Sequence, residues 1–119
     1  IKEMCDQLDH TMIHFDGPDG CVRHLPFLLE LKNLHGVQWN PSENCVNIRH
    51  LPILKKIQEA GKCLVLNTTP EEIDTLLSEL SPKGLLLNIN PFVKPFENTD
   101  QVDELLKKVE RLSFKKTIF

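Results

Sequence analysis

The sequence predicts an α/β fold built from four consecutive β-α units around a parallel sheet. Four short apolar runs, at 11–15, 36–39, 63–67 and 84–90, are each followed by polar residues and then by a segment of helical periodicity. Apolar runs of this kind are typical of parallel strands whose two faces are both covered. Regular alternation of strand and helix with short connections predicts right-handed β-α-β crossovers. The 119 residues therefore form a single α/β domain.

The helical segments carry apolar residues three and four positions apart and have recognisable end signals. The second segment stops at Gly61, a normal residue just past a helix end. The third opens with Thr69 as N-cap and Pro70 at the first helical position. Asn98 or Thr99 caps the fourth. The expected helices lie within 21–34, 48–62, 69–84 and 98–112.

Two architectures fit four β-α units. One is a small, open, doubly wound sheet of four strands, and the other is the C-terminal half of a TIM (β/α)8 barrel, which takes about 250 residues when complete. The pattern by itself does not separate them. Residues 1–10 are interpreted as the tail of a helix from a preceding unit, which indicates a half-barrel fragment.

The composition excludes several functional classes. The net charge is -3 and acidic residues outnumber basic ones, which does not suit a nucleic-acid-binding surface. The apolar runs are too short to span a bilayer, and the charged first ten residues do not form an export signal. Widely spaced cysteines without a close pair indicate reduced thiols of a cytoplasmic protein. They are Cys5, Cys21, Cys45 and Cys63.

Polar residues gather where the expected strands end, which is where parallel sheets bind ligands. They are His14, Asp16, Gln38, Trp39, Asn40, Asn67, Thr68, Asn88 and Asn90. Because strand side chains alternate, Asn88 and Asn90 are expected to share one side of the sheet. Three of these residues also have structural interpretations. Trp39 suits core filling, Asn67 suits a helix start, and Asn90 before proline suits a turn.

His14 and Asp16 are the strongest candidates for chemistry. They project from the same side of one strand, and two ionisable groups there are costly to bury unless they are paired or face a cavity. The following stretch "GPDG" at 17–20 permits a tight turn and leads directly into a helix, whose N-terminal amides suit a carboxylate or phosphate. Asp19 also fits a plain N-cap.

Three stretches together resemble the C-terminal half of the uroporphyrinogen decarboxylase-like superfamily, in its divergent bacterial branch that includes corrinoid-dependent methyltransferases. They are "IHFDGPDGCVRHLPFLLELKNLHGVQWNP", "IQEAGK" and "LVLNTTPEEIDTLLSELSPKGLLL". The resemblance covers about residues 9–112 and implies that these are the last four units of an eight-stranded β/α barrel. It implies a lyase acting on a carboxylated tetrapyrrole (a porphyrin precursor) or a related anionic substrate.

The resemblance implies roles for individual residues. His14 and Asp16 would be catalytic, with His14 holding or protonating an anionic group and Asp16 orienting it. The substrate-binding residues would be Gln38, Trp39, Asn67, Asn88 and Asn90. In the methyltransferase alternative, His14 and Asp16 would ligate zinc, although Asp16 stands where that branch has a cysteine.

Two kinds of partner follow from these expectations. The small-molecule substrate is one, and the N-terminal half of the barrel or a second copy of the chain is the other. The isolated chain is expected to be inactive, because active sites of this fold draw on loops from both halves. A second alternative is a non-catalytic interaction domain, since an open sheet with exposed apolar faces invites pairing.

Overall fold

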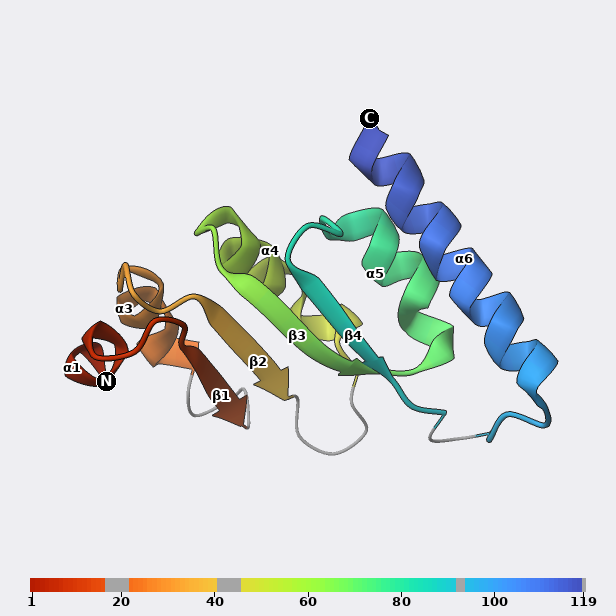
Figure 1. The fold of residues 1–119 in the computed structure, drawn as a ribbon, viewed down its shortest axis with the longest axis horizontal. Coiled ribbons are helices and arrows are strands. Elements are labelled where there is room, and N and C mark those ends of the chain that lie inside the picture. The colour runs from red at the N-terminus through yellow and green to blue at the C-terminus, as the bar shows by residue number, and fades with distance from the viewer. Residues whose placement is uncertain (17–21, 41–45, 92–93, 119) are drawn as a thin grey trace.

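A four-stranded parallel sheet forms the centre of the molecule (Figure 1). The computed structural model describes residues 1–16, 22–40, 46–91 and 94–118. The strands lie in the order in which they occur along the chain and all pair in parallel. They are β1 (Met12–Asp16), β2 (Gly36–Asn40), β3 (Cys63–Thr68) and β4 (Leu85–Ile89). The four strands and their alternation with helices confirm the expected α/β class.

The helices between the strands are shorter than the periodic segments suggested. Proline occupies the first turn of α3, α4 and η3, where its missing N–H costs nothing. A 3-10 turn precedes each of the helices α3, α4 and α5. The elements are α1 (Lys2–Asp6), η1 (Val22–His24), α3 (Leu25–Leu29), η2 (Ile48–His50), α4 (Leu51–Glu59), η3 (Pro70–Glu72), α5 (Ile73–Glu79) and α6 (Thr99–Ile118).

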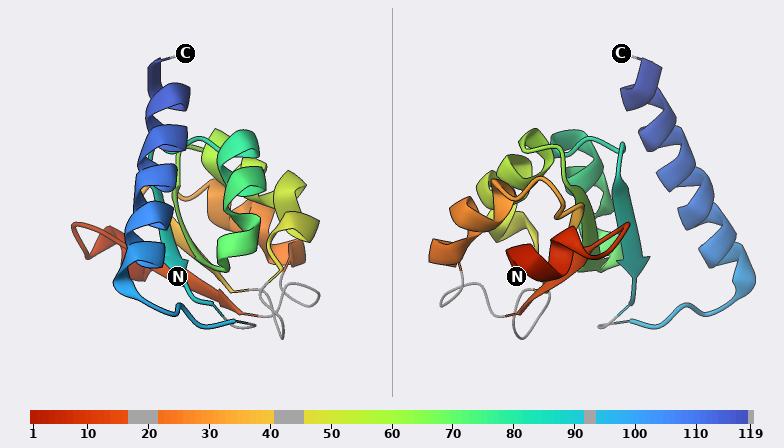
Figure 2. Two further views of the ribbon diagram at one scale, coloured as in Figure 1. Left: turned by 90° about the vertical axis from the view of Figure 1, so that its right-hand side faces the viewer. Right: turned by 60° about the vertical axis from the view of Figure 1, so that its left-hand side comes forward.

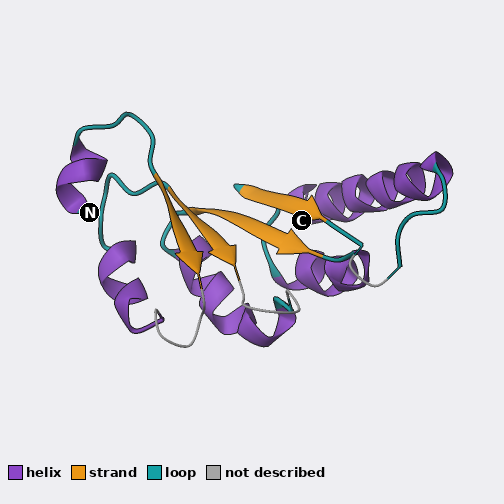
Figure 3. Ribbon diagram, turned by 90° about the horizontal axis from the view of Figure 1, so that it is seen from below, coloured by secondary structure: helices purple, strands orange, loops and turns teal. Residues whose placement is uncertain are grey.

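Helices α3, α4 and α5 cover one face of the sheet (Figures 1 and 3). Every second strand residue points into this layer and is apolar except Thr68, so the hydrophobic effect holds the helices against the sheet. Trp39 lies in this core, 1% exposed, with its ring stacked 5.5 Å from that of Phe15. Other fully buried members are Val37, Leu54, Ile57, Leu64, Leu66 and Leu76.

The opposite face of the sheet is not covered by α3, α4 or α5, so the expectation that both faces are covered is not met in the described chain. His14 and Asp16 on β1 and Leu86 and Asn88 on β4 are exposed there. A doubly wound sheet would place helices on both sides. The physical reason is visible in β1 and β4, where residues facing the helices alternate with residues of mixed polarity. We call this surface the open face.

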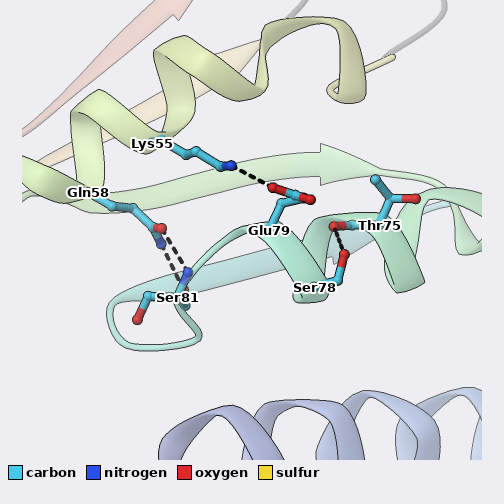
Figure 4. Close-up of polar contacts among 6 residues, drawn as sticks. All are labelled: Lys55, Gln58, Thr75, Ser78, Glu79 and Ser81. Carbon is cyan, nitrogen blue, oxygen red and sulfur yellow. Dashed lines mark hydrogen bonds and ion pairs between the residues drawn. The ribbon is translucent and has the colours of Figure 1, made fainter. Parts of the chain in front are cut away.

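Polar contacts join α4 to α5 at the rim of the helix layer (Figure 4). Lys55 Nζ lies 2.5 Å from Glu79 Oε2. Gln58 pairs with the backbone of Ser81, donating from Nε2 to the carbonyl at 2.7 Å and accepting at Oε1 from the N–H at 2.9 Å. Because Gln58 satisfies both backbone groups of Ser81, it fixes the turn from α5 into β4.

Helix α6 lies at the β4 end of the molecule, beside α5 and far from α1 (Figure 2). Asn98 caps it as expected, accepting at Oδ1 from the N–H of Gln101 at 3.1 Å. Lys108 Nζ lies 2.5 Å from Asp74 Oδ2 and ties α6 to α5. Thr69 occupies the N-cap position of η3 and Pro70 its first residue, as expected, but the Thr69 side chain makes no capping hydrogen bond.

Gly61 follows the last turn of α4 with φ of +76°, which confirms its predicted role after the helix end. An alanine Cβ at this position would meet nothing within 4 Å, so its cost would come from the backbone alone. We expect Gly61→Ala to lower the free energy of unfolding by about 1 kcal/mol, because a left-handed φ is unfavourable for residues with a Cβ.

The measurement is the urea midpoint at constant slope. Gly61→Asn is the matched control, because asparagine tolerates this region better. If alanine were as stable as glycine, α4 would not end in this conformation.

Candidate functional site

The open face carries its polar residues in register at the carboxyl ends of the strands. His14 lies opposite Gln38, and Asp16 lies opposite Asn40. Asn67 lies opposite Asn88 on the other strand pair. Parallel pairing thus brings together side chains that are far apart in the sequence, as the strand-end pattern predicted.

Three cross-strand hydrogen bonds join these side chains in pairs. His14 Nδ1 lies 3.1 Å from Gln38 Oε1, and Asn40 Nδ2 donates to Asp16 Oδ1 at 3.0 Å. Asn88 Nδ2 donates to Asn67 Oδ1 at 2.9 Å. Since the Gln38 carbonyl oxygen accepts, His14 Nδ1 donates and its Nε2 is left for a ligand. We call these six residues the polar row; they are His14, Asp16, Gln38, Asn40, Asn67 and Asn88.

Two predicted binding residues stand outside the polar row. Trp39 points to the helix layer, so it cannot line a site on the open face. Asn90 follows the end of β4, and its backbone N–H donates to the carbonyl of Thr68 at 2.8 Å. The "GPDG" stretch at 17–20, including the expected Asp19 cap, lies outside the described residues.

A groove of about 490 Å³ runs along the free edge of β1, beside two members of the polar row. His14 and Asp16 border it on one side, and Phe27 of α3 borders it on the other. Ile1 also lines a neighbouring groove of about 350 Å³, so the apolar surface continues toward the start of β1. The predicted catalytic pair therefore lies at an edge of the sheet that no described strand covers.

The electrostatic character of the open face is set by few charges. No position of the four described strands holds Lys or Arg, and Asp16 is the acidic residue among their side chains on this face. A shifted pKa is found instead in α1, where hydrogen bonds from Lys2 and Asn33 hold the pKa of Asp6 below its usual value. That pair is exposed and remote from the polar row.

The described residues include no group of three or more His, Cys, Asp or Glu side chains placed to hold a metal ion. His14 and Asp16 would supply two ligands on β1 to the zinc of the methyltransferase alternative. Cys5 and Cys63 are free thiols, while Cys21 and Cys45 lie in the segments that the structure does not describe. None of the described helices has the length and apolar composition that a bilayer span needs.

Asn47 and Glu72 are buried residues next to the site that the sequence reasoning missed. By its position, Glu72 is a first-turn acid that suits the N-terminal end of its own helix. Instead, its carboxylate accepts the backbone N–H groups of Asn47 at 2.7 Å and of Ile48 at 3.2 Å, at the start of η2. The one available signal was an Asn just before a helical segment. Sequence gives no means of knowing that a distant glutamate would reach it.

The chain has one tryptophan and no tyrosine, so its fluorescence reports on Trp39 alone. Since Trp39 is 1% exposed, we expect a blue-shifted emission and weak quenching by iodide until the protein unfolds. Ligands on the open face should leave its iodide quenching unchanged. Quenching as strong as in the urea-unfolded chain would contradict the buried position.

Comparison of the chain with protein-family models, with curated proteins and with solved structures finds no significant match.

Proposed function

We propose that the open face is one wall of a ligand-binding cleft, and that the chain is the C-terminal half of a uroporphyrinogen decarboxylase-like barrel enzyme. The observation that carries the proposal is the polar row, in which three hydrogen-bonded pairs line the carboxyl ends of all four strands. Ligands of parallel α/β folds bind at this end. The coverage of one sheet face by α3, α4 and α5 also supports a half-barrel, because barrels carry their helices outside.

The substrate in this proposal is a carboxylated tetrapyrrole or a related anionic molecule. In its imidazolium form, in which both ring nitrogens donate, His14 would donate from Nε2 to a substrate carboxylate while Nδ1 donates to Gln38 Oε1. The amide groups of the polar row would supply further neutral donors. Asp16 repels an anion, so the cationic groups that a multiply carboxylated substrate requires have to come from outside these strands. This requirement suits a barrel whose N-terminal half supplies the cationic groups.

Binding of uroporphyrin, followed by its visible absorbance, tests the substrate class. We expect His14→Ala to weaken binding about tenfold, since a hydrogen bond to a charged group contributes about 1.5 kcal/mol. Asp16→Asn should strengthen binding several-fold, because it removes a like charge near the carboxylates. Lys55→Ala, on the helix-covered side, is the control and should change nothing.

Asp16→Asn has different expected effects in the decarboxylase-like and methyltransferase alternatives. In the first it strengthens uroporphyrin binding, and in the second it abolishes zinc uptake. Were the methyltransferase alternative correct, His14 and Asp16 would bind zinc, and both His14→Ala and Asp16→Asn would abolish stoichiometric zinc uptake in elemental analysis. Wild-type protein that takes up one zinc through these two residues and ignores uroporphyrin would overturn the decarboxylase-like proposal.

A second candidate function is pairing through the open sheet, with the other barrel half or with a second copy. The specific observation is the gathering of exposed large apolar residues near the free edge of β1. Phe27 is the most exposed of them, at 71%. Exposed apolar patches and unpaired strand edges are typical of interaction sites. The patch consists of Ile1, Met4, Leu8, Met12 and Phe27.

We expect the purified chain to self-associate with rising concentration, measured as molar mass by light scattering after gel filtration. Phe27→Glu should shift the equilibrium toward monomer, since it places a charge in the apolar contact. Phe114→Glu, on α6 at the other end of the molecule, is a control of similar exposure. A wild-type chain that stays monomeric at all concentrations would exclude self-pairing and leave the other barrel half as the partner.

A further inference from the structure

Glu72 places a carboxylate inside the protein, 6% exposed, directly beneath the carboxyl end of β3. Four donors surround it. Oε1 accepts from the backbone N–H groups of Asn47 and Ile48, and Oε2 accepts from Asn47 Nδ2 at 3.0 Å and Thr68 Oγ1 at 2.8 Å. A buried charge is tolerated only when hydrogen bonds replace its water, so all four donors are held in place by the carboxylate.

The side chain of Asn47 passes this constraint on to the open face. Its Nδ2 donates both to Glu72 Oε2 and to the backbone carbonyl of Asn67 at 2.8 Å. Asn47 itself is fully buried. The carbonyl of Asn67 is thereby fixed from the helix side, while the side chain of Asn67 projects to the open face and accepts from Asn88.

A second connection runs through Thr68 to the end of β4. The hydroxyl of Thr68 is bonded to Glu72, and its backbone carbonyl accepts the N–H of Asn90 at 2.8 Å. Glu72 therefore contacts Thr68 directly, and it acts on the carbonyl of Asn67 only through Asn47. The bond from Asn90 to Thr68 joins two backbone groups and does not need the Thr68 hydroxyl, so the bridge from Glu72 to the Asn67–Asn88 pair is Asn47.

We propose that Glu72 is a positioning residue of the candidate site: acting through Asn47, it fixes the Asn67–Asn88 pair of the polar row. The carboxylate does not reach the open face itself and touches no ligand there. The inference rests on the proposed function only for the use of that pair, namely ligand binding. The coupling between Glu72 and the pair can be measured without any ligand.

Glu72→Gln is the informative change, because an amide cannot accept at both of its atoms. The backbone N–H groups of Asn47 and Ile48 cannot turn away, so the glutamine oxygen should stay with them. Its NH2 group then faces Asn47 Nδ2, donor against donor. The Thr68 hydroxyl can rotate and accept, but Asn47 has to move and release the carbonyl of Asn67.

The readout is the side-chain amide signal of Asn88 in nitrogen–proton correlation spectra, together with its hydrogen-exchange rate. We expect Glu72→Gln to move this signal toward that of a free amide and to speed its exchange several-fold. Asn47→Ala should do the same, and it remains informative if Glu72→Gln fails to fold. The double variant should shift the Asn88 signal no further than either single variant does, because both changes break the same connection.

Two controls separate positioning from general loss of stability. Thr68→Val removes one donor from the same carboxylate oxygen but leaves the bridge through Asn47, so the Asn88 signal should stay in place. Ile57→Val weakens the core on α4 and should also leave it unchanged. An unmoved Asn88 signal in folded Glu72→Gln or folded Asn47→Ala, or effects that add in the double variant, would overturn the inference.

The same variants distinguish failure of this inference from failure of the proposed function. If uroporphyrin does not bind the wild-type chain but the Asn88 signal responds as expected, the substrate proposal fails and the positioning role stands. If uroporphyrin binds and Glu72→Gln weakens its binding as much as Asn88→Ala does, both are supported. If uroporphyrin binds but the Asn88 signal never responds, only the positioning role fails.

Discussion

The parallel, sequential pairing of the four strands is the constraint on which the other features depend. It brings every strand's carboxyl end to one edge and makes side-chain direction alternate in step across the sheet. One set of residues then points to the helices and is apolar apart from Thr68, while the other set points to the open face. The polar row exists because polar residues fall on this second set in all four strands, so a slip of one residue in any strand would bury its polar side chain in the core.

Much of the fold was predictable because its signals are local. Runs such as 63–67 and the caps at Asn98 and Gly61 act over a few residues, and the structure agrees with them. The first helical segment was overestimated, since α3 ends at Leu29. Its periodic leucines continue in the following turn, where Leu34 is still buried. Periodicity reports burial of side chains, and a compact turn can bury them as well as a helix can.

The candidate site was predictable only where strand alternation decides it. His14, Asp16 and Asn88 project as expected, whereas Trp39 lies one position away from Gln38 and therefore faces the core. Asn47 and Glu72 could not be found, because their contact joins segments 25 residues apart and depends on how α5 sits beneath β3. Local rules assign Glu72 to its own helix, and only the packed structure shows that it accepts backbone N–H groups at the start of η2.

The charge of the open face narrows the chemistry that this chain can perform alone. Asp16 opposes anionic ligands, and the amides of the polar row are neutral donors and acceptors that add direction without net charge. A purely anionic substrate would therefore be bound here through hydrogen bonds and His14, at a cost in affinity that a partner with cationic groups has to offset. The free edge of β1 connects ligand binding with partner docking, because its groove borders both His14 and the exposed Phe27. A partner docked on that edge would complete the wall next to His14 and remove its water at the same time, so assembly and ligand affinity should rise together.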